Sequence, residues 1–411
     1  MGVASRVHPF PTPVQQAEPA PPASGRGDEL ALYIHWPFCV SKCPYCDFNS
    51  HVRESVDIAE WRAALLADLA HEAAILPGRA LGSIFFGGGT PSLMPPGLVE
   101  ALIEAATGHW PASDNIEITL EANPSSVEAA RFADLARAGV NRVSLGLQAL
   151  DDATLGFLGR AHGVDEGVRA LATAQQHFSR VSFDLIYARP GQTLGQWEAE
   201  LTRALSFGTG HLSLYQLTIE PGTRFETLVR RGELIPADDD HCADLFELTR
   251  SLTGAHGLSA YEISNHARPG EQSRHNLTYW RYGDYAGIGP GAHGRRGSLA
   301  TERHRKPENY LAAVARNGHG LSVERPLDAE ARAMEALLMG LRLAEGVDLA
   351  RIAALSGVAE AALIDRAAAE KLSALGLAHM TASHLTVTEQ GMPLLDALLA
   401  ELVAIEPPQA L

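Results

Sequence analysis

Short apolar runs alternate with amphipathic stretches from Leu30 onward, and this rhythm defines the expected architecture. Apolar runs rich in β-branched residues predict strands, and apolar positions at helical spacing predict helices. Strands are expected at residues 30–35, 83–86, 117–121, 142–147, 181–186 and 211–217, and helices at 58–74, 98–106, 127–138 and 194–206. A repeated strand–helix order requires parallel strands, so the sequence predicts an α/β fold with a partial (β/α)6, TIM-like barrel.

Four segments follow from the composition along the chain. Residues 1–27 are rich in Pro and Ala, with too few apolar side chains to pack, and are expected to be a disordered extension without a signal peptide. Residues 28–260 carry the barrel pattern, and residues 261–327 form an aromatic, glycine-rich linking segment whose stretch 279–294 reads as a compact loop. Residues 328–411 are expected to form a small winged-helix-like domain, with helices, a strand near 384–387 and a last helix after Gly391.

Charge and cysteine usage limit the functional class. The 411 residues carry a formal net charge of −16, and the part from Asp328 onward has five basic and twelve acidic side chains. Proteins that bind nucleic acids usually carry basic surfaces, so nucleic-acid binding is not expected for this chain. No apolar run is long enough to span a bilayer. Four cysteines do not suggest a disulfide framework, and a reducing, cytoplasmic location is expected.

The most informative stretch follows the first expected strand. Cys39, Cys43 and Cys46 form a C-x3-C-x2-C pattern, and Pro37 and Pro44 keep this segment from becoming a helix. Three thiolates from one loop suit a 4Fe-4S cluster and leave one of its irons without a protein ligand. The spacing therefore predicts a cluster whose open iron binds another molecule.

Two other interpretations of the cysteines stay open. A structural zinc site needs a fourth ligand, which His35 or His51 would supply. A thioredoxin-like redox pair explains Cys43 and Cys46 but leaves Cys39 without a role.

The three-cysteine pattern resembles that of the radical S-adenosylmethionine (SAM) superfamily. The resemblance implies that the open iron holds the amino and carboxylate groups of SAM, and that an electron from the cluster splits SAM into methionine and a 5′-deoxyadenosyl radical. Further matches follow in order. Gly87-Gly-Gly-Thr90 comes after the second strand, where a plain tight turn is the alternative, and Glu121 ends the third, where helix capping is the alternative.

The order and spacing of these motifs, from about Leu30 to the C-terminal domain, resemble the oxygen-independent coproporphyrinogen III oxidase family. The resemblance implies SAM contacts for Tyr33, Gly88, Gly89, Thr90, Glu121, Gln148, Arg160 and Asp184, with Gln216 as a weaker candidate. Taken singly, the later polar residues are commonly surface or internally satisfied side chains. Whether one or two SAM molecules bind does not follow from the sequence.

One departure separates the chain from the oxidases. They carry another cysteine two residues after the third, whereas this sequence has Phe48 at that position. In this respect the chain resembles the haem-chaperone branch called HemW. The segment His275-Asn-Leu-Thr-Tyr-Trp280 also matches a motif of that branch associated with haem, and imidazole is a common axial ligand of haem iron. A histidine hydrogen-bonded inside a loop is the alternative for His275, and His266 and His293 are weaker candidates.

These features predict a radical SAM haem chaperone that binds a 4Fe-4S cluster, SAM and haem and passes the haem to an acceptor protein. Cys242 is expected to be a buried thiol. The first alternative is a coproporphyrinogen III oxidase that decarboxylates propionates, and the second is a zinc-binding module without SAM chemistry. The sequence does not identify the haem acceptor, the electron donor or the oligomeric state.

Overall fold

The computed structural model describes residues 29–53 and 55–405. The extension expected at residues 1–27 lies outside the described residues. Among the helices in these two ranges, none is long and apolar enough to cross a membrane.

Six parallel strands form the centre of a 12-stranded sheet and follow one another in sequence order. They are β1 (Glu29–Trp36), β4 (Ala80–Gly88), β5 (Ala112–Ala122), β6 (Arg142–Gln148), β7 (Arg180–Tyr187) and β8 (His211–Gln216). All six predicted strands are therefore present, most of them extended by one or a few residues. The sheet ends at β14 on one side and β9 on the other, so the barrel is incomplete, as expected.

A seventh parallel strand corrects the expectation for residues 279–294. Instead of a compact loop, this stretch contains β11 (Tyr285–Ile288), which pairs with β1. The antiparallel strands β12 (His293–Arg296), β13 (Leu299–Arg303) and β14 (Leu321–Pro326) then continue the sheet beyond β11. Four residues including a glycine give too short a pattern to predict such a strand, and its partner lies about 250 residues earlier in the chain.

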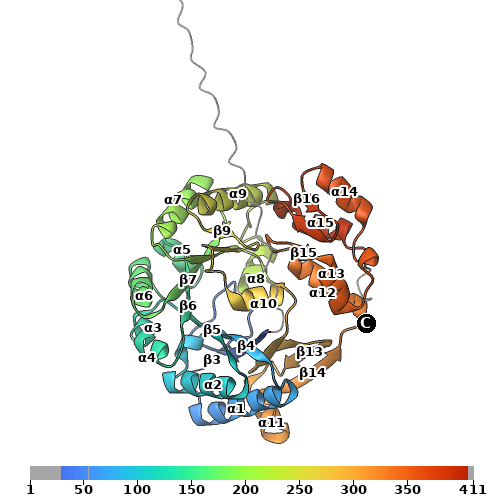
Figure 1. Cartoon of the computed structure of the whole chain (residues 1–411). Helices are drawn as coiled ribbons and strands as arrows, with labels where there is room; N and C mark the ends of the chain where they lie inside the picture. Colours follow the sequence, from blue (N-terminus) through green and yellow to red (C-terminus); the bar gives the residue numbers. More distant parts are fainter. Residues whose placement is uncertain (1–28, 54, 406–411) are drawn as a thin grey trace, which may run out of the picture.

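Helices cover the outer face of the barrel and surround it in Figure 1. They include α1 (Ile58–Ile75), α2 (Pro96–His109), α5 (Asp152–Phe157), α6 (Val164–His177), α7 (Leu194–Leu205) and α9 (Asp239–Ala255). The helix expected at 127–138 is split into α3 (Ser126–Ala129) and α4 (Phe132–Arg137). The split arises because the Arg131 amide bonds to the carbonyl of Glu128, three residues earlier, instead of continuing the α-helical pattern.

Alternation along the strands separates the two faces of the sheet. On β1, Leu30, Leu32 and Ile34 are fully buried in the main hydrophobic core under the helices. Tyr33 and His35 lie on the opposite face, inside the barrel. The interior is therefore lined by polar and aromatic side chains, while the apolar ones hold the helices.

A second hydrophobic core belongs to the C-terminal residues. It is built from α12 (Ala329–Gly340), α13 (Leu349–Ser356), α14 (Arg366–Ala374) and α15 (Leu395–Leu402), with a small sheet of β15 (Val347–Asp348), β17 (His384–Val387) and β16 (Ala378–Met380). The expected strand is β17. Three helices followed by an antiparallel pair of strands give the predicted winged-helix-like arrangement.

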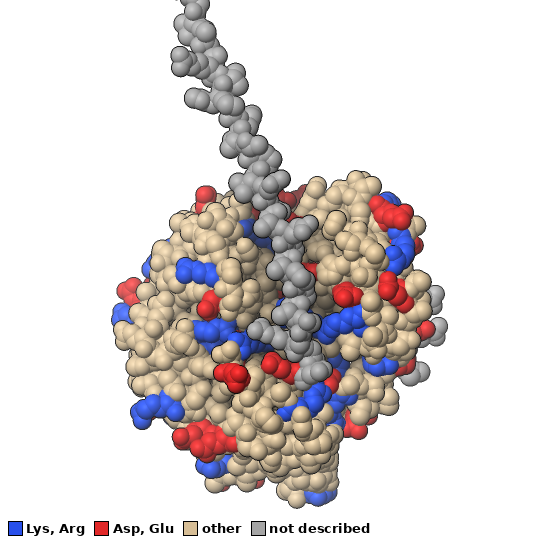
Figure 2. Space-filling view, viewed as in Figure 1, with Lys and Arg blue, Asp and Glu red and all other residues tan. Residues whose placement is uncertain are grey.

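The remaining elements connect these parts. The short strands are β2 (Phe38–Cys39), β3 (His51–Val52), β9 (Ser259–Ala260) and β10 (Asn265–Ala267), the helices are α8 (Arg224–Arg230), α10 (Arg274–Trp280) and α11 (Pro307–Asn317), and the 3-10 turns are η1 (Pro91–Leu93), η2 (Glu360–Ala362) and η3 (Met392–Leu394). Helix α10 lies across the centre of the barrel in Figure 1. On the same face, acidic and basic side chains are interspersed (Figure 2).

Candidate functional site

The three-cysteine loop leaves the C-terminal end of β1 and is closed by a miniature sheet. Strand β2 pairs in parallel with β3, which places Cys39 opposite Val52. The Cys46 amide bonds to the Cys43 carbonyl at 3.2 Å, so the last two cysteines share one tight turn. All three are free and partly exposed. Burial raises the pKa of the Cys39 and Cys46 thiols, so a metal that binds them displaces protons.

Two of the sulfur atoms receive hydrogen bonds from elsewhere in the barrel. The Thr90 hydroxyl donates to Cys39 Sγ and an Arg160 guanidinium N–H donates to Cys43 Sγ, both at 3.5 Å. Asn123 joins these donors, because its Nδ2 donates to Thr90 Oγ1 at 3.2 Å and its Oδ1 accepts from Arg160 at 2.6 Å. The ends of three strands are thereby tied to the cysteine loop, and hydrogen bonds to the sulfurs would tune a cluster's potential.

Asn123 was missed by the sequence reasoning. It follows β5 and lies two residues after Glu121, so strand alternation places both side chains on the same face. This spacing was the signal available in the sequence.

The triple glycine permits a close approach between strands. Gly88 has φ 117°, and a Cβ on Gly89 would lie 2.7 Å from the Phe38 carbonyl oxygen. The amides of Gly89 and Thr90 bond to the carbonyls of Trp36 and Phe38 at 2.7 and 2.8 Å. The segment therefore packs directly against the cysteine loop and is more than a tight turn.

Tyr33 and His35 form a hydrogen-bonded pair inside the barrel. The Tyr33 hydroxyl lies 2.9 Å from His35 Nδ1, and His35 Nε2 lies 2.9 Å from the Asn49 carbonyl oxygen. Because a carbonyl only accepts, Nε2 donates and Nδ1 accepts. Burial lowers the pKa of His35 to about 4, so the ring is neutral at pH 7.

This arrangement bears on the zinc alternative. Both ring nitrogens of His35 are engaged, so His35 is not available as a fourth ligand. Within residues 29–53 and 55–405, no three His, Cys, Asp or Glu side chains converge at the spacing that one metal ion requires. Sulfurs that bind separate corners of a cluster stand farther apart than the ligands of a single ion, so this observation concerns a single metal ion and not a cluster.

Two carboxylates inside the barrel, Glu121 and Asp184, form no ion pair with any residue that the structure describes. Glu121 accepts a hydrogen bond from the Gly88 amide at 3.2 Å, and Asp184 accepts one from Ser144 at 3.2 Å. Burial, followed by the charge of Asp184, raises the pKa of Glu121 to about 8. Burial raises the pKa of Asp184 to about 6. Such shifts fit a site that receives a cationic or hydroxyl-bearing ligand.

Gln148 and Arg160 lie side by side and carry polar atoms without partners. Gln148 has φ 70°, an uncommon conformation for a residue with a side chain. Its Oε1 and Arg160 Nε are buried, and within the described ranges neither makes a hydrogen bond. Orphaned polar atoms beside a sulfur-rich loop, together with the three thiols, fit a site built for a cluster and a polar cofactor.

Gln216 points away from this group. Its Nε2 donates to the Cys242 carbonyl on α9 at 2.7 Å, on the outer side of β8. The SAM contact expected for its side chain remains a prediction that this placement does not support. Alternation brings Tyr215 inward instead. The Tyr215 ring is 41% exposed, yet desolvation and then Asp184 raise the pKa of its phenol well above the usual range, as expected for a ring facing the interior of an open barrel.

His275 lies at the other end of the barrel from the cysteines. It is 5% exposed, its Nδ1 is 3.1 Å from Ser83 Oγ, and its ring stacks on Phe85 with centroids 4.9 Å apart. Its amide donates to Glu117, which pairs with Arg180, the first residue of β7. Helix α10 therefore closes the N-terminal end of the strands. Burial lowers the pKa of His275 to about 4.

The weaker candidates lie elsewhere. His266 is 1% exposed on β10, and burial lowers its pKa to about 3. His293 begins β12 and is exposed. Cys242 is partly buried in α9, so the prediction of a buried thiol is only approximately met.

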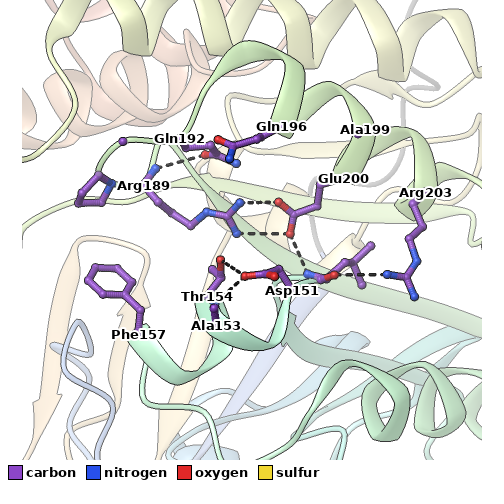
Figure 3. Close-up of a pocket in the computed structure, with 13 residues that line it drawn as sticks. Asp151, Ala153, Thr154, Phe157, Arg189, Gln192, Gln196, Ala199, Glu200 and Arg203 are labelled. Carbon is purple, nitrogen blue, oxygen red and sulfur yellow. Dashed lines mark hydrogen bonds and ion pairs between the residues drawn. The ribbon is translucent and has the colours of Figure 1, made fainter.

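A cavity of about 670 Å³ lies between α5 and α7 (Figure 3). An ion pair of Arg189 and Glu200 closes one side of it, and Asp151 and Phe157 line the other. Helix α5, which forms this second wall, leads directly to Arg160. The short helix α5 therefore lies between the cavity and the cysteine loop.

Known protein families and individual proteins similar to this chain agree with the site described above. A family model described as the Radical SAM superfamily matches residues 33–204, and one described as the HemN C-terminal domain matches residues 327–394. The protein called "Heme chaperone HemW" of Escherichia coli (strain K12) is 39% identical over 377 residues, which are 90% of this chain and 97% of that protein. The chain belongs to the HemW family of radical SAM proteins.

Other relatives extend this assignment. A Bos taurus protein called "Radical S-adenosyl methionine domain-containing protein 1, mitochondrial" is 41% identical over 340 residues. The aligned region is 80% of this chain and 76% of that protein. The solved structure of coproporphyrinogen III oxidase (HemN) from Escherichia coli superimposes with a TM-score of 0.76 over 92% of this chain and 91% of that one, at 20% identity. That likeness establishes a shared fold for the HemW-family chain, including its C-terminal domain.

Proposed function

We propose that this chain is a radical SAM haem chaperone, which holds a 4Fe-4S cluster and SAM at the C-terminal end of the barrel and transfers haem to an acceptor protein. Cys39, Cys43 and Cys46 would bind the cluster, which supplies the electron for SAM cleavage when it is bound. Thr90 and Arg160 donate hydrogen bonds to the cysteine sulfurs and hold the loop in place.

SAM would occupy the interior next to this loop. The backbone of Gly88 and Gly89 packs against the start of the cysteine loop and would contact SAM there. The remaining contacts would come from Tyr33, Thr90, Glu121, Gln148, Arg160 and Asp184. Glu121 and Asp184 are suited to hydrogen bonds from ammonium or hydroxyl groups of the cofactor. The unpartnered Oε1 of Gln148 offers another acceptor.

The observation that carries the proposal is the near full-length similarity to a protein called a haem chaperone, together with Phe48 at the place where the oxidases have a further cysteine. The oxidase alternative is favoured only by the shared fold, which does not transfer an activity at 20% identity.

The haem would bind at α10, which carries the His275-Asn-Leu-Thr-Tyr-Trp280 motif. The contact between His275 Nδ1 and Ser83 leaves Nε2 as the nitrogen for iron, and the low pKa keeps the imidazole neutral, as coordination requires. Because the ring is packed on Phe85 in the barrel, coordination requires α10 to move away from the strand ends. The haem motif and the cysteine loop would then act at opposite ends of the barrel.

Anaerobically reconstituted protein tests the SAM chemistry. Electron paramagnetic resonance of the reduced cluster is expected to change when SAM is added, because SAM would bind the open iron. An unchanged spectrum contradicts the proposal. Incubation with coproporphyrinogen III, SAM and a reductant is expected to give no decarboxylated product, and product formation would instead support the oxidase.

Haem titration tests the proposed ligand. His275→Ala is expected to lose the absorption bands of imidazole-ligated haem, while the exposed His177→Ala, at the end of α6, is expected to keep them. Identical spectra in both variants would exclude His275 as the ligand but would leave the cluster assignment unaffected. We also propose a cytosolic location. The acceptor would be an apoprotein that takes up haem.

A further inference from the structure

The cysteine loop exposes three large apolar side chains. Fourteen such side chains are exposed in the part of the chain that the structure describes, and three of them fall between residues 40 and 52. They are Val40, Phe48 and Val52, which are 70%, 61% and 49% exposed. Apolar groups gathered in so short a segment indicate an interaction surface, whereas scattered ones are normal.

These side chains surround the cysteines. Val40 follows Cys39 directly, Val52 pairs with Cys39 across the β2–β3 sheet, and Phe48 lies two residues after Cys46. We call Val40, Phe48 and Val52 the loop patch. A partner that covers this patch would lie against the residues that flank the three cysteines.

Basic side chains lie around the loop patch. Lys42 is exposed in the loop itself, and Arg305 and Lys306 are also exposed. These two residues lie beside the loop, because the Asn49 side chain donates a hydrogen bond to the Arg305 carbonyl at 2.9 Å. Arg53 pairs with Glu308 at the start of α11.

Lys42, Arg53, Arg305 and Lys306 are thus the cations in or next to the loop, and Asp47 and Glu308 are carboxylates in the same segments, in a chain whose net charge is −16. An apolar centre with a locally positive rim fits a partner that is acidic at its docking face.

The proposed chemistry requires such a partner. Cleavage of SAM consumes an electron from the cluster, and the chain has only one cysteine outside the loop, Cys242 on α9. The electron would therefore come from another molecule and would enter through the partly exposed loop that carries the three cysteines.

We propose that the loop patch and its basic rim dock an acidic one-electron carrier protein that reduces the cluster. The inference rests on the proposed function. In each encounter the carrier is oxidised by one electron and the cluster is reduced by one, and no bond is formed or broken. A haem acceptor is the less favoured occupant, because the haem motif on α10 lies at the opposite end of the barrel.

Stopped-flow reduction of the reconstituted cluster tests the proposal, with reduced flavodoxin as the acidic probe and dithionite as a small reductant that needs no docking surface. Phe48→Asp and Lys42→Glu are each expected to lower the second-order rate constant with flavodoxin by about tenfold or more. The rate with dithionite is expected to stay unchanged. Val127→Asp, which replaces a 72% exposed side chain on α3, is the matched control and is expected to keep both rates.

Other outcomes overturn the proposal. Unchanged flavodoxin rates in both loop variants, or a wild-type rate that does not fall with rising ionic strength, would exclude this docking mode. Normal flavodoxin rates combined with slower haem transfer to the acceptor would assign the patch to the acceptor. If dithionite reduces the wild-type cluster but SAM is not cleaved, the proposed function fails while the docking result stands, so the two failures are distinguishable.

Discussion

Replacing Glu121 by glutamine tests the proposed SAM site through its dependence on pH. Glu121 accepts a hydrogen bond from the Gly88 amide, and burial followed by Asp184 raises its pKa to about 8. At pH 6 the neutral acid therefore predominates in the ligand-free protein. A cationic ligand favours the carboxylate, so SAM binding is expected to release a proton and to strengthen as the pH rises.

The size of the effect follows from the ionised fraction. With a pKa of about 8, Glu121 is roughly 1% ionised at pH 6 and about half ionised at pH 8. If SAM binds only the ionised form, the apparent dissociation constant equals the intrinsic one divided by this fraction, so the affinity rises by about 50-fold between these pH values. Asp184, with a pKa of about 6, adds a second inflection at lower pH.

Isothermal titration calorimetry of SAM binding, repeated in buffers of different ionisation enthalpy, measures both the affinity and the protons released. Glu121→Gln is expected to lose the rise above pH 7 and to retain the inflection near pH 6. The α-amino group of SAM also titrates, and its contribution remains in the variant together with that of Asp184. Wild-type affinity that does not change from pH 6 to 8 would refute the assignment.

The same shift has a consequence for stability. Between the ordinary pKa of 4.5 and about 8, the folded protein binds the Glu121 proton more tightly than the unfolded chain does. Stability without ligand therefore falls as the pH rises through this window. Glu121→Gln is expected to stabilise the ligand-free protein more at pH 8 than at pH 5 in chemical denaturation. An equal effect at both values would contradict the raised pKa.

Two further predictions concern the framework of the site. Asp68 is fully buried and bonds to Arg303, so Asp68→Asn is expected to lower the free energy of unfolding by about 3–5 kcal/mol in urea denaturation, and the exposed Asp134→Asn by less than about 1 kcal/mol. Gly89→Ala places a methyl group against a β2 carbonyl and is expected to lower the iron content after reconstitution, whereas Gly97→Ala meets nothing within 4 Å and serves as the control. Equal iron contents would show that Gly89 is not needed for close packing.

Several site residues were predictable because local patterns place them. A strand directs alternate side chains to one face, and its last residues lie at one end of a parallel sheet. Cys39, Gly88, Glu121 and Gln148 all lie at or just beyond the C-terminal ends of predicted strands, and the structure brings them to one end of the barrel.

Other features depended on contacts that no local pattern contains. Gln216 and Tyr215 are neighbours in sequence, and only the pairing of β8 decides which one faces the barrel interior. Asn123 shares the face of Glu121 by strand alternation, but its bonds to Thr90 and Arg160 join segments far apart in the chain.

Six of the parallel strands, the set of three cysteines and the resemblance to the family could be read from the amino-acid sequence, because hydrophobic periodicity and ligand spacing are local properties. The pairing of β11 with β1, the closure of the N-terminal end of the barrel by α10 and the place of His275 opposite the cysteine loop became known from the folded structure. These arrangements depend on pairing and packing between segments far apart in the chain, whose free energy is spread over many distant contacts and leaves no periodic signal in either segment.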